Sequence, residues 1–193
     1  KLIYDGEEHV SIATFGDAIK NQTIVINGVS KTYAMTGWRI GYAAGPRPII
    51  KAMTAYLSHA ASNPNSIAQE AAAAAIAAGD APCVKEMVAE FDARRLLMHR
   101  LVNSIPGVSA HLPKGAFYIM ANIGGLIGKK YNGETITGSD QFAALLLNSK
   151  HVAVVPGNAF GDDRHVRLSY ATSADKITRG IGRMAEFVGE LTE

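Results

Sequence analysis

A lysine and an arginine, Lys31 and Arg39, stand in one short stretch of small, polar and aromatic residues. An apolar run predicts a buried strand before it, at residues 23–27, and a second strand follows at residues 40–44. We expect the lysine to be partly desolvated there, and burial disfavours the charged form of an amine. A neutral amine forms a Schiff base with an aldehyde, and an arginine binds a phosphate through paired hydrogen bonds. On spacing alone, an ordinary surface lysine and a structural arginine remain the alternative.

A further arginine, Arg167, lies inside a strand predicted at residues 166–170. A charge among apolar neighbours needs a partner. Two interpretations stay open, namely a salt bridge within the protein and a carboxylate ligand held through two hydrogen bonds.

Hydrophobic periodicity predicts alternating strands and helices around these residues, which is typical of an α/β or α+β protein. We expect Ser66, Asp80 and Ser173 to be helix N-caps. The helices are expected at residues 47–60, 66–79, 80–105, 139–149 and 173–191. Further strands are expected at residues 108–112, 116–121 and 152–155, with a glycine-rich loop at 124–138. The solvated face of the long helix is expected to carry Arg94, Arg95 and Arg100.

Composition limits the classes of function. The 193 residues are 48% hydrophobic with a net charge of +2, so the chain is globular and has no general attraction to nucleic acid or to an anionic membrane. The single cysteine, Cys83, excludes an intrachain disulfide framework. No apolar run is long enough to span a membrane, and no metal-binding motif occurs, so we expect no metal. The absence of a signal segment favours the cytoplasm.

The stretch at residues 30–41, SKTYAMTGWRIG, resembles the cofactor-attachment signature of the class I aminotransferases, which use pyridoxal 5′-phosphate. Every position matches that signature, which runs Ser-Lys, any, aromatic, small, aliphatic, any, Gly, any, Arg, any, Gly. Later blocks are similar too and follow the family's order. They are SNPNSIAQ (62–69), PKGAFY (113–118), VVPGNAFG (154–161) and VRLSYATS (166–173). The aspartate aminotransferase-like branch is the most similar one.

The resemblance implies a role for each charged residue. Lys31 would bond covalently to the cofactor and, once displaced by the substrate, act as the general base. Arg39 would bind the cofactor phosphate, and Arg167 would bind the α-carboxylate of the substrate. Gly28 stands where the family often has a serine that contacts the phosphate, and Ser30 is a candidate substitute.

The resemblance also implies the fold and its division. The chain resembles the C-terminal half of a fold-type I enzyme. It would comprise the end of the large cofactor domain (1–80), a linking helix (81–105) and the α+β small domain (106–193). The family's partners of the cofactor ring fall outside the chain. We therefore expect the polypeptide alone to be inactive or nearly so.

The expected reaction is transamination between aspartate and 2-oxoglutarate. The alternatives are an aromatic amino acid aminotransferase, a C–S or β-elimination lyase of the same fold, and a non-catalytic interaction domain. Family members form homodimers, and residues 62–69 are a candidate for the contact that crosses between subunits. Four aromatic residues either line the site or pack in the core. They are Tyr33, Trp38, Phe117 and Tyr118.

Overall fold

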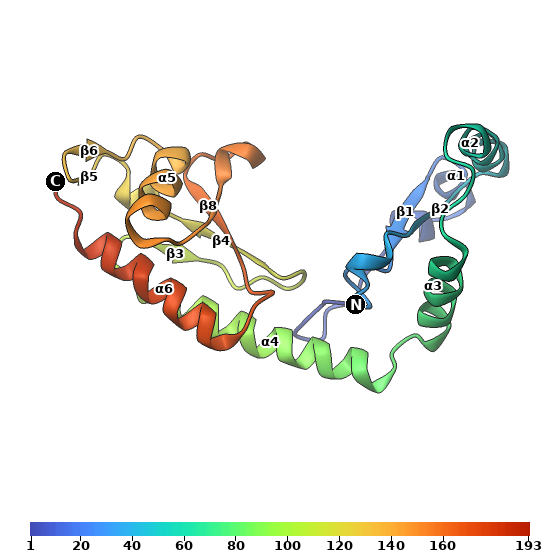
Figure 1. The fold of residues 1–193 in the computed structure, drawn as a ribbon, viewed down its shortest axis with the longest axis horizontal. Coiled ribbons are helices and arrows are strands. Elements are labelled where there is room, and N and C mark those ends of the chain that lie inside the picture. The colour runs from blue at the N-terminus through green and yellow to red at the C-terminus, as the bar shows by residue number, and fades with distance from the viewer. The chain divides into compact units, whose positions relative to one another are not determined.

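A computed structural model describes residues 1–193 as two compact units (Figure 1). The first unit comprises Lys1 and Gly6–Met87, and the second comprises Leu2–Asp5 and Val88–Glu193. The division into a cofactor domain, a linking helix and a small domain stays a prediction. The two compact units differ from this predicted division. Leu2–Asp5 belong to the second unit, and the boundary within the long helix falls after Met87.

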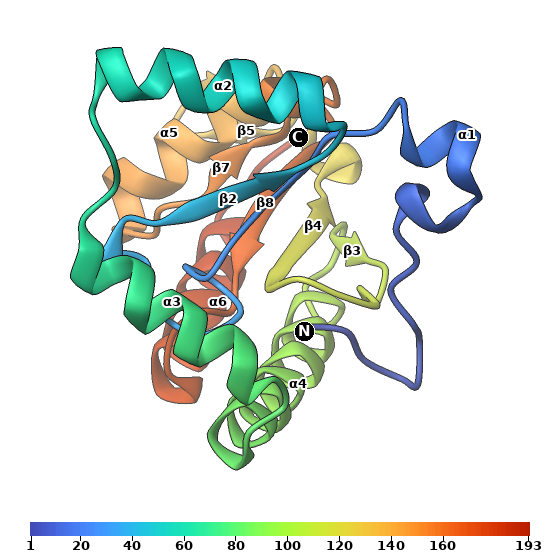
Figure 2. The same ribbon diagram turned by 90° about the vertical axis from the view of Figure 1, so that its right-hand side faces the viewer.

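The first unit contains an antiparallel hairpin, a short helix and two longer helices. Strands β1 (Val25–Gly28) and β2 (Gly41–Ala44) pair from Val25 opposite Ala44 to Gly28 opposite Gly41. Both predicted strands are confirmed with slightly shifted ends. Figure 2 shows helix α2 running along β2. The other elements are η1 (Ile12–Thr14), α1 (Asp17–Lys20), η2 (Thr36–Trp38), α2 (Arg47–Ala60) and α3 (Ser66–Ala78).

This unit buries very little apolar surface. Neither strand of the hairpin contains a buried residue, and neither does α2. The buried hydrophobic residues of the unit are Val29, Ala68, Ala72 and Val84. A hairpin of two strands is marginally stable in water, and this one gains little stabilisation from buried apolar surface.

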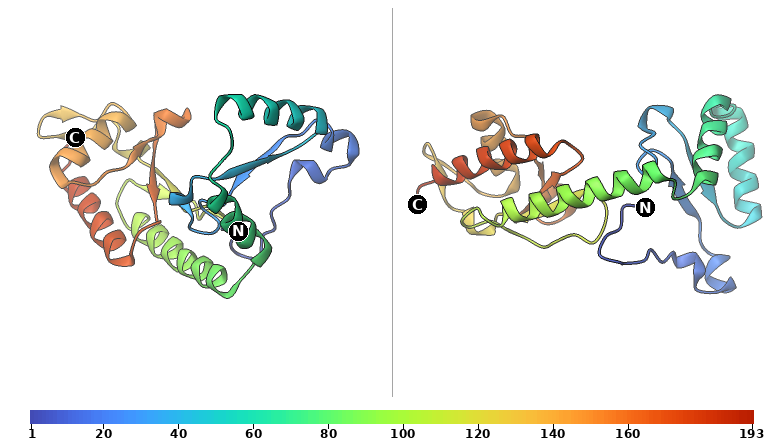
Figure 3. Two further views of the ribbon diagram at one scale, coloured as in Figure 1. Left: turned by 45° about the vertical axis from the view of Figure 1, so that its right-hand side comes forward. Right: turned by 90° about the horizontal axis from the view of Figure 1, so that it is seen from below.

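The second unit is built on a four-stranded antiparallel sheet with the strand order β3-β4-β8-β7. Its helices are α4 (Pro82–Val102, which begins in the first unit), α5 (Ser139–Lys150) and α6 (Ala174–Gly189). The sheet strands are β3 (Ser109–Ala110), β4 (Tyr118–Asn122), β7 (Val155–Pro156) and β8 (His165–Ser169). Figure 3 shows α4 in green and α6 in red. The mixture of helices and strands confirms the predicted α/β class.

The region expected to be a glycine-rich loop is more ordered than predicted. It contains η3 (Gly124–Leu126) and a small hairpin of β5 (Lys130–Tyr131) and β6 (Glu134–Thr135). Short strands of two residues give no detectable period, so the sequence pattern could not reveal them. A further short helical turn, η4 (Gly157–Phe160), lies between β7 and β8.

One face of the sheet forms the core, because side chains alternate between the two faces of a strand. The buried sheet residues are Ile119, Ala121, Val166 and Leu168. Helical spacing predicts a buried stripe of Ile177, Ile181, Met184, Val188 and Leu191. The first four are buried on α6, together with Phe187, whereas Leu191 lies beyond the end of the helix and is half-buried. The Phe187 ring contacts Phe142 of α5 at a centroid distance of 5.5 Å. The residues between the buried ones, Tyr118 and Arg167 among them, lie on the other face of the sheet.

Two of the three predicted helix caps are wrong. The cap of α3 is Asn65, one residue before Ser66, and its side chain accepts a hydrogen bond from Ala68 N. Asp80 precedes α4 by more than one residue, and its carboxylate pairs with Lys1 Nζ. Ser173 is confirmed, since its hydroxyl accepts a hydrogen bond from Lys176 N at 3.3 Å.

The expectation that Arg95 lies on a solvated helix face is also wrong. Its side chain is 1% exposed and hydrogen-bonds to both oxygens of Asp5, to Asp92 and to the carbonyl oxygen of Pro113. The guanidinium also lies over the ring of Tyr4 at 4.5 Å. The acidic partners hold the pKa of Arg95 above its usual value. Arg95 therefore fastens Leu2–Asp5 to the rest of the second unit.

Two tyrosine hydroxyls reinforce this attachment. Tyr4 and Tyr170 both donate a hydrogen bond to the carbonyl oxygen of Ala116, at 2.6 and 3.0 Å. Ala116 has a left-handed backbone with φ of 61°, which an alanine rarely adopts without support. Burial raises the pKa of both tyrosines.

None of the helices combines the length and apolar character that crossing a bilayer requires.

Candidate functional site

The connection between β1 and β2, residues 29–40, contains both Lys31 and Arg39. It is closed by the pairing of Gly28 with Gly41. A Cβ atom on Gly28 would lie 3.2 Å from the carbonyl oxygen of Ile40, and one on Gly41 would lie 3.0 Å from that of Asn27. A side chain at either position would therefore need a small shift of the opposite strand.

Lys31 lies at the start of this connection, in a turn directly after the buried Val29. Tyr33 N donates a hydrogen bond to Val29 O at 3.1 Å, and Ala34 N donates to Lys31 O at 3.3 Å. The Lys31 side chain is exposed, so the expectation of partial desolvation is wrong for this polypeptide. The flanking strands β1 and β2 contain no buried residue, so they give the amine no apolar cover. No carboxylate pairs with the Lys31 amine.

Arg39 ends the short helical turn η2 in a left-handed conformation, with φ of 51° and ψ of 48°. Its Nη1 atom donates a hydrogen bond to the carbonyl oxygen of Thr36 at 3.0 Å. The side chain is exposed and no carboxylate pairs with it. The connection therefore presents one amine and one guanidinium, and neither is neutralised by the protein.

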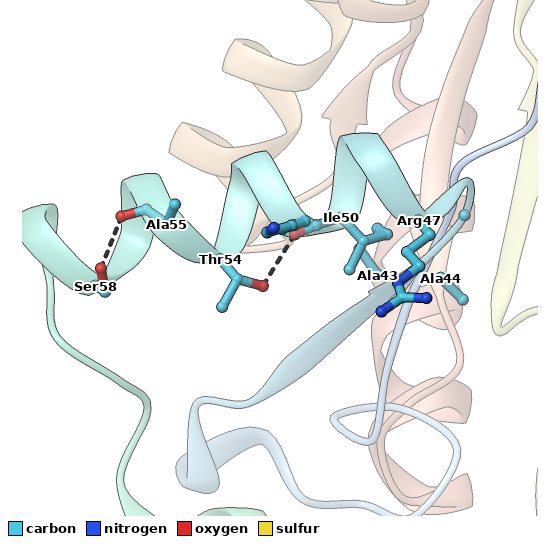
Figure 4. A pocket seen from close by; sticks show the side chains of 9 residues that line it. Ala43, Ala44, Arg47, Ile50, Thr54, Ala55 and Ser58 are labelled. Atoms are coloured by element: carbon cyan, nitrogen blue, oxygen red, sulfur yellow. Dashed lines mark hydrogen bonds between the residues drawn. The ribbon is translucent and has the colours of Figure 1, made fainter.

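Two pockets of the first unit lie near this connection or next to β2, and neither is lined by Lys31 or Arg39. A pocket of about 720 Å³ lies between β2 and α2 and is lined by Ala43, Arg47, Ile50 and Thr54 among others (Figure 4). The Thr54 hydroxyl donates to Ile50 O within the helix, so it could only accept a hydrogen bond from a ligand. A smaller pocket of about 300 Å³ adjoins the connection. Its lining residues are Lys1, His9, Asn27, Gly28, Thr32, Tyr33 and Tyr42.

Arg167 lies in the second unit, on β8 between Met120 of β4 and Val155 of β7. Its guanidinium carbon lies over the Tyr118 ring at 4.4 Å and over the Phe160 ring at 4.6 Å. The side chain is half-buried, and no carboxylate of the chain pairs with it. No salt bridge within this chain accounts for Arg167, and binding of a carboxylate ligand stays a prediction.

The four candidate aromatic residues differ in their surroundings. Tyr33 lines the small pocket beside the connection, and Trp38 is 45% exposed. Phe117 packs against Phe91, with ring centroids 6.0 Å apart, as a core residue would. Tyr118 contacts Arg167. The sequence reasoning missed Phe160, although it stands in the block at residues 154–161 that resembles the family.

Carboxylates in the turn before β8 are held in their charged form. Hydrogen bonds from the Ser139 hydroxyl and backbone amide lower the pKa of Asp163 below its usual 3.8. A contact of 2.8 Å between Asp162 Oδ2 and His165 Nδ1 lowers the pKa of Asp162 in the same way. Both groups stabilise the loop that carries Phe160.

Comparison with known proteins places these residues in a family context. The chain is 46% identical over 188 residues to an aspartate aminotransferase of Bacillus subtilis (strain 168). The aligned region covers 97% of this chain and 47% of the relative. The crystal structure of the aspartate aminotransferase from Rhizobium meliloti superposes with a TM-score of 0.93 at 43% identity, covering 99% of this chain and 48% of that one. An aromatic aminotransferase from Pyrococcus horikoshii OT3 gives a TM-score of 0.85 at 40% identity, covering 97% and 48%.

The chain spans about half the length of the curated relatives it matches. The match nevertheless includes every candidate residue, because the model of the family described as aminotransferase class I and II covers residues 1–184. The signature around Lys31 and the block around Arg167 both lie within that range. This chain belongs to the class I and II aminotransferase family.

Proposed function

We propose that this chain supplies the cofactor lysine and two anion-binding arginines of a pyridoxal-phosphate-dependent aminotransferase that acts on aspartate and 2-oxoglutarate. The observation that carries the proposal is the connection closed by Gly28 and Gly41, which holds Lys31 and Arg39 without a carboxylate partner. The aspartate aminotransferases among the relatives, at 46% and 43% identity, support this substrate.

The residues present fit the cofactor in their chemistry. Pyridoxal 5′-phosphate combines an aldehyde, which an amine bonds covalently, with a phosphate, which a guanidinium binds. The unneutralised Lys31 and Arg39 match these two groups. When bound, the cofactor supplies an electron sink for the pair of electrons left when a proton leaves the substrate Cα.

Three side chains of this chain then have distinct tasks. Lys31 is the covalent anchor, and its free amine is the base that removes the proton from the substrate Cα. Arg39 binds the phosphate and keeps the cofactor in place. Arg167 binds the α-carboxylate of the amino acid through two hydrogen bonds, which orients the Cα–H bond for its removal.

Spectroscopy and labelling of the purified chain test the proposal. Pyridoxal phosphate is added, an imine absorbance band is sought, and borohydride reduction is followed by mass spectrometry of the peptides. We expect the added mass on Lys31, and we expect Lys31→Ala to lose both band and label. Lys51→Ala, which removes an exposed lysine of α2, is the matched control. Labelling spread evenly over several lysines contradicts the proposal.

A second substrate class has specific support, because the solved aromatic aminotransferase is 40% identical over 97% of this chain. Aspartate and phenylalanine are each added to the chain loaded with pyridoxal phosphate and not reduced, or to that chain combined with the remaining half of a relative. A 2-oxo acid product identifies transamination and names the preferred side chain. Release of free ammonia identifies a lyase. An unreactive Lys31 leaves only an interaction domain.

We also propose that the protein works as a homodimer in the cytoplasm. The candidate crossing segment, residues 62–69, is exposed apart from Ala68, so its side chains are accessible to a second subunit. The exposed, unpaired Cys83 is compatible with a reducing compartment. Sedimentation of the chain with and without the substitution Asn63→Ala tests the dimer, which should dissociate more readily in the variant.

A further inference from the structure

The guanidinium of Arg167 is oriented by aromatic rings and not by an acidic residue. Tyr118 and Phe160 contact it at 4.4 and 4.6 Å. An arginine side chain has several rotatable bonds, and contact with a ring face restricts the plane of its guanidinium. Because no carboxylate occupies its N–H groups, they stay available to a ligand. Under the proposed function, on which this inference rests, that ligand is the substrate carboxylate.

The two rings are held in different ways. Tyr118 lies on β4, whose register with β8 is fixed by the ladder that pairs Tyr118 with Ser169 and Met120 with Arg167. Phe160 ends the short turn η4 and is 50% exposed, so no ladder and little packing hold it. The position of Phe160 therefore depends on what fixes the turn.

A buried serine at the start of α5 provides that fixation. Ser139 is 0% exposed; its hydroxyl donates to Asp163 Oδ1 at 2.7 Å and accepts from Asn158 N, inside η4, at 3.1 Å. Its backbone amide also donates to Asp163 Oδ1, at 2.9 Å. Asp163 thus caps α5, which Gly138 has no side chain to do.

The start of the turn is equally constrained. A Cβ atom on Gly157 would lie 2.2 Å from the carbonyl oxygen of Asp162 and 2.3 Å from that of His165. The amide of Asp162 donates a hydrogen bond to Gly157 O at 3.1 Å. The turn is therefore fastened to Ser139 through Asn158 and to the segment before β8 through Gly157.

We propose that Ser139 and Asp163 are positioning residues for Arg167, acting through η4 and the ring of Phe160. Neither of them contacts Arg167. Their hydrogen bonds hold the turn, the turn holds the ring, and the ring restricts the guanidinium to an orientation that accepts a carboxylate. Loss of the junction is expected to loosen Arg167 while the sheet around it stays intact.

Nitrogen-15 NMR of the arginine side chains in the 193-residue chain tests this without any ligand. The Nε–H signal of Arg167 is assigned from its absence in Arg167→Lys. We expect Ser139→Ala and Phe160→Leu each to increase the mobility of the Arg167 side chain that this signal reports. In the double variant the side chain should be no more mobile than in Phe160→Leu alone, because Ser139 acts through Phe160. Phe160→Tyr, which keeps the ring, should restore the wild-type signal.

Ser149→Ala is the matched control, because the Ser149 hydroxyl bonds only to Leu145 O within α5. Backbone signals of β4 and β8 report whether each variant is folded. If Ser139→Ala does not fold, Asp163→Asn carries the same test. An unchanged Arg167 signal in the folded Ser139 or Asp163 variant overturns the inference, and so do additive effects of Ser139→Ala and Phe160→Leu.

Titration with maleate, a plain dicarboxylate, separates this inference from the proposed function. We expect a saturable shift of the Arg167 signal, and an apparent Kd about threefold to fivefold higher in Ser139→Ala and in Phe160→Leu. If maleate shifts no Arg167 signal while the mobility results hold, the proposed role of Arg167 fails and the positioning inference stands. If maleate binds but the two variants match wild type in mobility and in Kd, only the positioning inference fails.

Discussion

The guanidinium of Arg95 and the carboxylate of Asp5 meet edge to edge, with Nη1–Oδ2 and Nη2–Oδ1 distances of 2.7 Å. The two residues are 90 positions apart in the chain. This bidentate pair therefore connects the beginning of the polypeptide to the middle of α4.

We expect Arg95→Met to lower the free energy of unfolding by about 3 kcal/mol, because it removes the charged partner of several hydrogen bonds at a fully buried position. The neighbouring Arg94 pairs with Glu90 at 2.7 Å on a partly exposed surface, so Arg94→Ala should cost less than about 1 kcal/mol. Urea unfolding of both variants measures the difference. Equal losses would contradict the structural role of Arg95.

Acid should destabilise the protein through Asp5 and Asp163. Hydrogen bonds from Arg95 and Ser139 lower the pKa of these carboxyl groups below their usual 3.8 in the folded state. The unfolded chain then binds protons more readily, so this contribution is complete well above pH 3.8 and is lost as the pH falls below it. Unfolding free energies measured from about pH 6 down to about pH 3 should fall less steeply in Asp5→Asn and Asp163→Asn.

Two glycine substitutions should have opposite effects. Gly157→Ala places a Cβ atom 2.2 Å from a backbone oxygen, so we expect a loss of about 3 kcal/mol. Gly182 lies within α6 with nothing near its Cβ position, so Gly182→Ala should stabilise the helix by about 0.5–1 kcal/mol. Thermal or urea unfolding of both variants gives the sign. A harmless Gly157→Ala would show that the turn can shift.

The rates of amide hydrogen exchange should differ between the elements that contain buried residues and those that do not. In β4 and β8 every second residue is buried in the core. In β1, β2 and α2 no residue is buried. We expect amides of β4 and β8 to exchange about a hundredfold more slowly than those of β1, β2 and α2 in the isolated chain. Mass spectrometry of deuterated peptides measures this. Similar protection in both sets would mean that the hairpin acquires a core from another copy of the chain.

Removal of the phosphate-binding charge should release the cofactor. Arg39 has no carboxylate partner, so Arg39→Gln is expected to weaken retention of pyridoxal phosphate about tenfold or more. Arg47→Gln, at the start of α2 and outside the connection, is the control. Dialysis followed by the imine absorbance gives the retained fraction. Equal losses in the two variants would contradict a specific role for Arg39.

Long periodic segments were predictable from the sequence, because burial of one face requires apolar residues at regular spacing. The helix predicted at residues 47–60 is α2 without any shift, and four of the five stripe residues predicted for α6 are buried, with Leu191 wrong and Phe187 missed. Strands of two residues, such as β5 and β6, are too short to show a regular spacing of apolar residues. The cap of α3 was placed one residue late because Asn65 and Ser66 both suit that position, and only the backbone decides between them.

The sequence provides candidate residues for the site but not their surroundings. Local sequence makes Lys31, Arg39 and Arg167 candidates, and these roles stay predictions, whereas burial depends on residues far away in the chain. Thus Lys31 is exposed although an apolar strand precedes it, and Arg95 is buried because Asp5 approaches from a distant position. Phe160 could not be associated with Arg167 before the turn between β7 and β8 was seen.

The pairing of Gly28 with Gly41 has a consequence for how such a site evolves. Because the two glycines end the ladder side by side, the sheet register is set outside the connection, and residues 29–40 can vary without displacing either strand. Under the proposed function, the Lys31 amine and the Arg39 guanidinium thus lie in one segment whose two ends are held at a fixed spacing by the strand pairing. Exchange of residues 29–40 between related chains would then move both groups together without changing that pairing.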